Sequence, residues 1–140
     1  MPDEARAGQG AGPVGPRVLL VDDEERFLAT MAKLMRKKGL DVRVAESGLK
    51  ALEEMARDEP DVVVLDVKMP GMDGLTALGL IKTRHPLIEV IILTGHAAVE
   101  SAMEGIKGGA FDFLIKPCGL EELLEKVQEA WERRKIRRRP

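Results

Sequence analysis

The sequence predicts an α/β domain in which five short strands alternate with five helices. Apolar runs short enough for buried strands recur along the chain from Arg17 onward. Between these runs, apolar residues fall at helical spacing, and Gly, Pro or Asp residues stand where several helices begin or end. Strands that alternate with helices form a parallel sheet through right-handed crossovers, with helices on both faces.

Five apolar stretches predict the strands. Most are nearly continuous runs of Val, Ile, Leu or Phe, and the second alternates apolar and polar residues. In chain order the stretches are Val18–Val21, Val42–Val44, Val62–Leu65, Glu89–Leu93 and Phe111–Ile115.

Helical spacing of apolar residues predicts the segments between the strands. The apolar faces are formed by Phe27, Leu28, Met31, Leu34 and Met35, then Leu49, Leu52, Met55 and Ala56, then Leu75, Leu78 and Ile81, and last Leu120, Leu123, Leu124, Val127 and Trp131. Gly39 and Pro60 end the first two helices, and Asp73 is an N-cap for the third. The fourth helix, over residues 97–108, is expected to be weak, because it contains glycines that each cost about 1 kcal/mol relative to Ala.

Composition indicates one soluble globular domain. The chain has 140 residues, of which 44% are hydrophobic, and the 22 Lys and Arg nearly balance the 24 Asp and Glu. A net charge of −2 gives no reason to expect a strongly charged partner such as nucleic acid. Residues 133–139 carry six positive charges, and we expect them to continue a solvated helix rather than to bind nucleic acid.

The chain has the features of a cytoplasmic protein. Its single cysteine, Cys118, cannot form an internal disulfide, which fits a reducing compartment. We find no secretory signal and no apolar run near the roughly 20 residues that span a bilayer. The predicted organisation is a flexible Gly- and Pro-rich tail over 1–16, one domain over 17–134 and a basic tail over 135–140.

Polar side chains follow four of the five predicted strands. They are Asp22, Asp23 and Glu24 after the first strand, Asp66 after the third, Thr94 after the fourth and Lys116 after the fifth. Because the carboxyl ends of parallel strands meet at one edge of the sheet, we expect these side chains to converge. Taken singly, each has an ordinary explanation, such as a helix cap for Asp23, a turn for Thr94 or solvation for Lys116.

The predicted cluster suits phosphoryl transfer to a carboxylate. Three neighbouring carboxylates repel one another, and Mg²⁺, which prefers oxygen ligands, compensates that charge. A carboxylate can act as the nucleophile and form an aspartyl phosphate. The metal, the hydroxyl of Thr94 and the ammonium of Lys116 can then neutralise the three equatorial oxygens.

These motifs resemble the receiver domains of two-component response regulators. The matching segments are V-L-L-V-D-D-E at 18–24, V-V-V-L-D-V-K-M-P-G-M-D-G at 62–74, I-I-L-T-G-H at 91–96 and G-A-F-D-F-L-I-K-P at 109–117. The resemblance covers about residues 17–134, which makes this segment the expected receiver domain. It implies a flavodoxin-like (βα)5 three-layer sandwich with the strand order 2-1-3-4-5.

The resemblance also implies roles for individual residues. Asp66 is the expected phosphoacceptor, and Mg²⁺ or Mn²⁺ is expected between Asp22, Asp23, Asp66 and the backbone carbonyl of Lys68. Thr94 and Lys116 are expected to contact the phosphoryl oxygens. The peptide bond from Lys116 to the following proline, Pro117, is expected to be cis.

Three further positions matter for switching and for phosphate lifetime. Phe113 stands at the position of the family's switch aromatic, lacks a hydroxyl and has a core role as its alternative. Lys68 and His96 stand beside the path that the hydrolytic water takes in the family, and for His96 a surface role is the alternative.

The resemblance implies a signalling switch rather than an enzyme, although the domain assists its own phosphorylation and dephosphorylation. The expected partners are a sensor histidine kinase or phosphotransfer protein and a downstream protein or an output domain outside this chain. Output is expected through the fourth helix, fifth strand and fifth helix, and a phosphorylation-dependent homodimer is a further alternative. The sequence identifies neither the kinase nor the output.

Two other function classes share parts of this pattern. Phosphatases of the haloacid dehalogenase type use Asp, Thr and Lys but need an acid two residues after the nucleophile, where this chain has Lys68. Flavodoxin-like cofactor binders need a Ser-, Thr- or Gly-rich loop after the first strand, where this chain is acidic.

Overall fold

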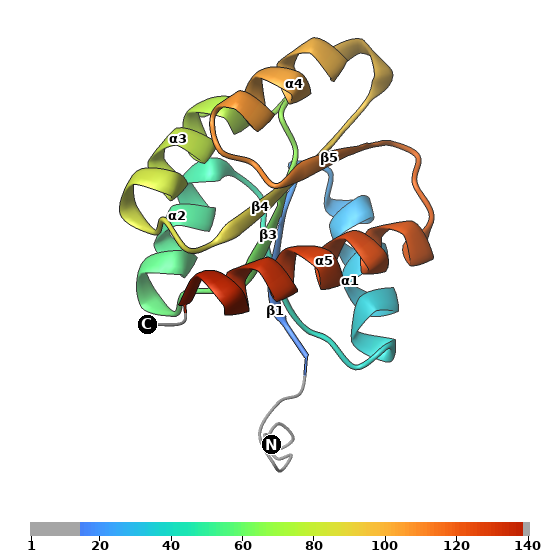
Figure 1. Cartoon of the computed structure of the whole chain (residues 1–140). Helices are drawn as coiled ribbons and strands as arrows, with labels where there is room; N and C mark the ends of the chain where they lie inside the picture. The colour runs from blue at the N-terminus through green and yellow to red at the C-terminus, as the bar shows by residue number, and fades with distance from the viewer. Residues whose placement is uncertain (1–14, 139–140) are drawn as a thin grey trace.

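The computed structural model describes residues 15–138, in which strands and helices alternate (Figure 1). In chain order the elements are β1 (Arg17–Val21), α1 (Glu25–Lys37), β2 (Asp41–Ala45), α2 (Gly48–Arg57), β3 (Val62–Leu65), α3 (Gly74–Arg84), β4 (Glu89–Thr94), a 3-10 turn (His96–Ala98), α4 (Val99–Lys107), β5 (Asp112–Ile115) and α5 (Leu120–Arg138). Most of the predicted 1–16 tail lies outside the described residues.

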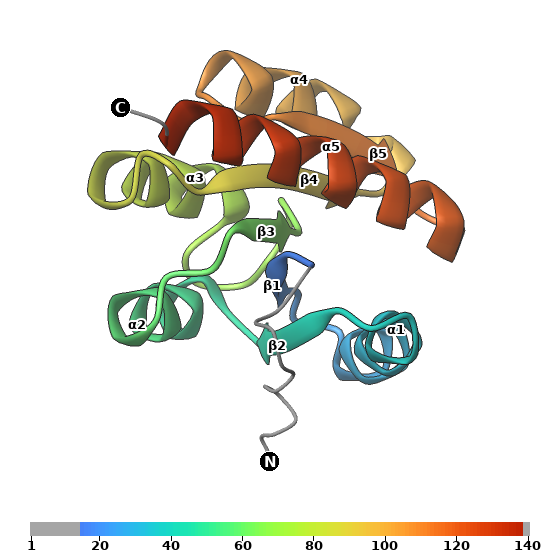
Figure 2. The same ribbon diagram turned by 60° about the horizontal axis from the view of Figure 1, so that its bottom comes forward.

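The five strands form one parallel sheet in the order β2-β1-β3-β4-β5. Helices α1 and α5 cover one face, and α2, α3 and α4 cover the other (Figure 2). This arrangement confirms the predicted three-layer fold and its strand order.

The core consists of two apolar layers, one on each face of the sheet. Neighbouring residues of a strand point to opposite faces, so Leu19 and Val63 pack toward α2 and α3 while Leu20 and Val64 pack toward α1 and α5. Every residue of the central strands β3 and β4 is buried, whereas the edge strand β2 leaves Val44 40% exposed.

The last turns of α5 are tied to the amino-terminal end of the sheet. Arg134, which is 6% exposed, donates a hydrogen bond of 2.8 Å to Asp61, and Arg137 donates one of 2.6 Å to the buried Glu89. Because buried carboxylates need compensating charge, these arginines are part of the folded domain. Helix α5 thus continues through residues 135–138, which the sequence assigned to a basic tail.

Within residues 15–138 we find no helix whose length and apolar character would let it cross a membrane.

Helix α4 approaches the sheet closely because residue 105 has no side chain. Gly105 is buried, and a Cβ added there would lie far closer to Ile92 Cδ1 on β4 than van der Waals contact allows. Glycine at position 105 therefore lowers the helix propensity of α4 but allows the helix to pack closely against β4. Gly108 differs, because it is exposed and is the C-cap of α4.

We expect Gly105→Ala to lower the free energy of unfolding by about 1–3 kcal/mol, because Ile92 must leave its packed rotamer. Gly108→Ala is the matched control, since the nearest atoms to its added Cβ lie 3.5 Å away, an ordinary contact. Urea unfolding of both variants measures the difference. Equal losses would mean that packing against Ile92 does not govern this position.

Candidate functional site

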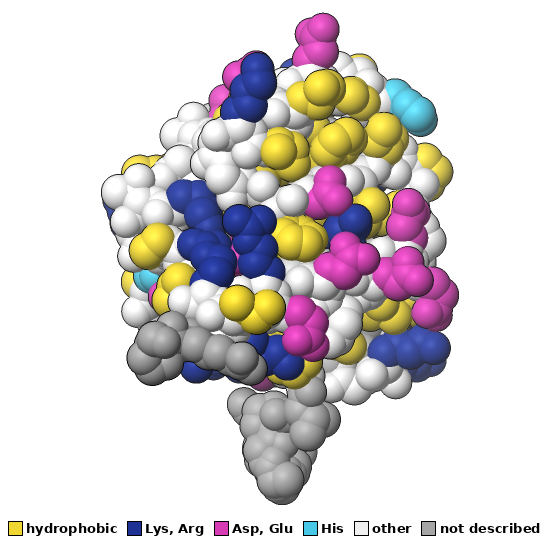
Figure 3. Space-filling model, viewed as in Figure 1, with side chains coloured by type: hydrophobic (Ala, Val, Ile, Leu, Met, Phe, Trp, Pro, Cys, Tyr) yellow, Lys and Arg dark blue, Asp and Glu magenta, His cyan; other side chains and the backbone are white. Residues whose placement is uncertain are grey.

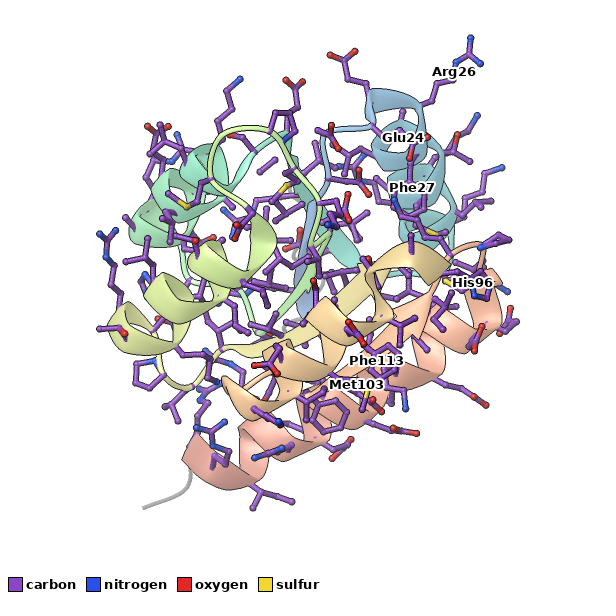
Figure 4. The ribbon with its side chains drawn as sticks, turned by 90° about the horizontal axis from the view of Figure 1, so that it is seen from above. Glu24, Arg26, Phe27, His96, Met103 and Phe113 are labelled. Atoms are coloured by element: carbon purple, nitrogen blue, oxygen red, sulfur yellow. The ribbon has the colours of Figure 1, made fainter. Side chains whose placement is uncertain are left out.

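The carboxyl ends of the strands bring three carboxylates together. One oxygen each from Asp22, Asp23 and Asp66 lies within 4.8 Å of the others. Asp22 and Asp23 follow β1, and Asp66 follows β3, its neighbour in the sheet. Figure 4 looks onto this end of the molecule, where α1 begins.

Backbone hydrogen bonds fix the two buried carboxylates. The N–H of Glu24 donates to Asp22 Oδ1 at 3.0 Å, and the N–H of Lys68 donates to Asp66 Oδ1 at 3.2 Å. Gly74 begins α3 directly against the backbone of Asp66, where any Cβ would collide with the Asp66 carbonyl oxygen. The chain therefore needs glycine at this position to fold the loop after β3 around Asp66.

Burial and like charge perturb the titration of Asp66. The residue is 8% exposed, and burial is the largest cause that raises its pKa from 3.8 to about 6. The negative charges of Asp22 and Asp23 act in the same direction, while the positive charge of Lys116 opposes them. The arrangement therefore favours a neutral Asp66 carboxyl group below about pH 6.

Lys116 supplies the positive charge at this edge. Its Nζ donates a hydrogen bond of 2.6 Å to Asp22 Oδ2 and lies 3.5 Å from Glu24 Oε1. Burial lowers the pKa of Lys116, but the hydrogen bond to Asp22 and the surrounding negative charges outweigh burial and raise it. The peptide bond between Lys116 and Pro117 is cis in this structure.

Thr94 contributes a buried hydroxyl at the end of β4. Its residue exposure is 0%, and its Oγ1 has no hydrogen-bond partner among the described residues. A buried polar atom without a partner costs free energy, so this hydroxyl gains from any acceptor that enters the site.

The other predicted positions differ in how far they are buried. Lys68 and His96 have exposed side chains, and Phe113 is half-buried on β5, packed against the core layer beneath α2, α3 and α4. For Lys68 the recorded contact with Asp66 is made by the N–H, so a metal-binding role of its carbonyl stays a prediction.

Two residues at this edge were assigned no partner in the site from the sequence, although Glu24 stood among the polar residues expected to converge there. Glu24 contacts Lys116, and the Phe27 ring lies under the same ammonium, with 4.5 Å between Nζ and the ring centroid. Their position in the sequence could have indicated a role: Glu24 directly follows Asp22 and Asp23, and Phe27 lies in the first turn of α1. Helical spacing had placed Phe27 on the apolar face of the first helix.

Comparison with known proteins identifies the family. The chain matches the response regulator receiver domain over residues 18–128. The DNA-binding transcriptional regulator NtrC of Escherichia coli is 39% identical over 113 residues, which are 81% of this chain and 24% of NtrC. The transcriptional regulatory protein PrrA of Mycobacterium tuberculosis is 34% identical over 123 residues, which are 88% of this chain and 53% of PrrA.

A solved structure agrees with this assignment. The response regulator receiver domain protein from Clostridium thermocellum superposes with a TM-score of 0.82 at 34% identity, covering 86% of this chain and 97% of that one. The chain spans about a quarter of NtrC and about half of PrrA. Neither the phosphatase nor the cofactor-binder alternative matches these relatives. The chain belongs to the receiver-domain family of two-component response regulators.

Proposed function

We propose that Asp66 accepts a phosphoryl group from a histidine kinase or phosphotransfer protein, with Mg²⁺ or Mn²⁺ bound beside it. The observation that carries this proposal is the convergence of three carboxylate oxygens within 4.8 Å, one of them on a buried acceptor. The domain then acts as a switch that assists its own phosphorylation and dephosphorylation.

The acidic cluster fits a hard divalent cation. Its donors are all oxygen atoms. Burial and, after it, repulsion from the neighbouring carboxylates raise the pKa of Asp66, and a cation relieves that repulsion. Asp22, Asp23 and Asp66, with the backbone carbonyl of Lys68, are the proposed ligands. When bound, the cation neutralises negative charge on the carboxylates and on the incoming phosphoryl group.

The transfer step uses Asp66 as the nucleophile. A carboxylate oxygen of Asp66 forms a bond to phosphorus, the bond between phosphorus and the donor breaks, and its electron pair leaves with the donor. The donor is a phosphorylated imidazole nitrogen or, in the laboratory, acetyl phosphate, which releases acetate. The ammonium of Lys116 and the unpartnered hydroxyl of Thr94 then donate to the phosphoryl oxygens.

The proposed output surface comprises α4, β5 and α5. Met103 and Ile106 on α4 are 55% and 38% exposed, and apolar side chains gather at the α4 end of the face in Figure 3. Figure 4 labels Met103 on α4 and Phe113 on the adjacent β5. A partner protein, an output domain outside this chain or a second phosphorylated copy would bind there.

NtrC is named as DNA-binding, but most of its length lies outside the match, so we do not propose DNA binding for this domain.

Asp66→Asn should abolish phosphorylation by acetyl phosphate, because an amide has the shape of the carboxylate but is not a nucleophile. Intact mass after incubation with Mg²⁺ should show one phosphate on the wild type and none on the variant. Asp58→Asn, at an exposed carboxylate outside the site, is the control and should label normally. Stoichiometric labelling of Asp66→Asn would disprove the assignment.

Mg²⁺ affinity should fall as the pH drops below about 6, because the proton on Asp66 must leave before the carboxylate can bind metal. Calorimetric titrations at pH 5, 6 and 7.5 measure this effect. Asp66→Asn should weaken binding and remove most of the pH dependence between pH 5 and 7.5. An affinity that stays constant across this range would contradict the role of Asp66.

The same pKa predicts a stability effect in the metal-free protein. The folded state holds the Asp66 proton up to about pH 6 and the unfolded state only to 3.8, so stability falls as the pH rises between these values. With a chelator at pH 7.5, Asp66→Asn should therefore be more stable than the wild type by about 1–2 kcal/mol. Urea unfolding should find the gain disappearing toward pH 4, and a gain independent of pH would exclude this explanation.

Phosphorylation should alter α4 and β5, because Thr94 leads through the 3-10 turn directly into α4. Hydrogen exchange with and without Mg²⁺ and beryllofluoride, a phosphoryl mimic, should differ most over residues 94–115. Thr94→Ala should still bind the mimic but transmit a smaller change. A difference confined to the surroundings of Asp66 would show that the site binds phosphate without switching this surface.

A further inference from the structure

The Lys116 ammonium lies in a cradle formed where β1 ends and α1 begins. Its Nζ is 2.6 Å from Asp22 Oδ2, 3.5 Å from Glu24 Oε1 and 4.5 Å from the centroid of the Phe27 ring. Within residues 15–138, the ion pairs of Lys116 are with Asp22 and Glu24, and none is made with Asp66. The ammonium thus lies on the α1 side of the site.

Glu24 has no structural task that would explain its side chain. It is the N-cap of α1, where Ser, Thr, Asp and Asn are favoured, and it makes no side-chain capping bond. Its carboxylate, although 67% exposed, instead lies beside Lys116. Its N–H fixes Asp22 Oδ1 at 3.0 Å, so the same residue holds both members of the Lys116–Asp22 pair.

Phe27 completes the cradle from the first turns of α1. Its ring is half-buried against the core layer shared with α5, which fixes its position under the ammonium. An aromatic face attracts a cation at this distance, and the attraction is stronger where water is partly excluded. The side chain of Lys116 is 22% exposed, so this contact is only partly solvated.

We propose that Glu24 and Phe27 are positioning residues that hold the Lys116 ammonium in a resting place beside Asp22, away from the acceptor. The inference rests on the proposed phosphorylation of Asp66, for which this ammonium must reach the phosphoryl group. Each contact is weak, since exposed ion pairs and cation–π contacts contribute little individually. The hold therefore slows transfer by a modest factor and releases Lys116 when a stronger anion appears.

Nuclear magnetic resonance tests the resting place without any phosphorylation. Protons above an aromatic ring resonate upfield, so the Hε signals of Lys116, assigned by their loss in Lys116→Met, should be shifted upfield in the free protein. Phe27→Leu should remove this shift, and Phe27→Trp should retain it. Adding Mg²⁺ and beryllofluoride should move the wild-type signals toward those of solvated lysines. Signals that are never upfield, or that stay upfield with the mimic bound, would overturn the proposal.

Transfer kinetics test the consequence. At saturating Mg²⁺, Glu24→Gln should raise the rate of phosphorylation by acetyl phosphate about 1.5- to fivefold, the size expected for releasing a weak ion pair. Glu25→Gln is the matched control, because it removes an exposed carboxylate from the first turn of α1 without touching Lys116. In a Lys116→Met background, Glu24→Gln should have no effect.

The outcomes separate this inference from the function on which it rests. A wild-type chain that is never phosphorylated would refute the proposed function, while the resonance experiment would still decide where Lys116 rests. If the wild type is phosphorylated but Glu24→Gln is phosphorylated at the same rate or more slowly, only the proposed restraint on Lys116 would be refuted. Equal acceleration by Glu25→Gln, or acceleration that persists without Lys116, would mean that general charge repulsion and not positioning sets the rate.

Discussion

Three carboxylates can share one edge of the sheet because an ammonium is bound to the most buried of them, Asp22. Asp22 is 2% exposed, and a buried carboxylate without a counter-charge would be strongly destabilising. Lys116 meets that need at 2.6 Å, but a single cation cannot compensate three acids. Burial and, after it, the negative charges of Asp22 and Asp23 keep the pKa of Asp66 raised. The metal-free site is thus left short of positive charge, and this shortage is what a divalent cation would satisfy.

The two ends of the sheet handle buried charge differently. At the amino-terminal end, the guanidinium groups of Arg134 and Arg137 pair with Asp61 and Glu89 and clamp α5 to the domain. At the carboxyl end, a flexible lysine faces more carboxylates than it can neutralise. Arginine forms fixed, directional pairs, whereas lysine carries a mobile point charge. The first end therefore suits permanent structure, and the second suits a site that exchanges ligands.

Helix α4 and the 3-10 turn before it connect the site to the proposed output surface. This segment packs closely against the sheet, but few local contacts hold its amino end. Helix α4 lies against β4 at Gly105, yet no side chain caps its amino end, and a 3-10 turn connects it to Thr94. In the proposed switch, a displacement of Thr94 would therefore be passed directly to α4. Close packing allows few intermediate positions, so the helix would move between discrete arrangements.

From the amino-acid sequence alone, local periodicity predicted the alternation of strands and helices, and the resemblance to receiver domains implied the strand order. The positions of Asp22, Asp23, Asp66, Thr94 and Lys116 after predicted strands led us to expect them at one edge of the sheet. Local periodicity could not say which partner each charge takes. Arg134 and Asp61 lie 73 residues apart and Lys116 and Asp22 lie 94 apart, so their pairing depends on the folded arrangement of α5 and of the strand ends. The same holds for Gly105, whose low helix propensity predicted weakness but whose small size allows close contact with β4. The contacts of Glu24 and Phe27 with Lys116 form only in the folded protein. The residues around them in the sequence do not indicate that a side chain from the end of β5 will lie beside them.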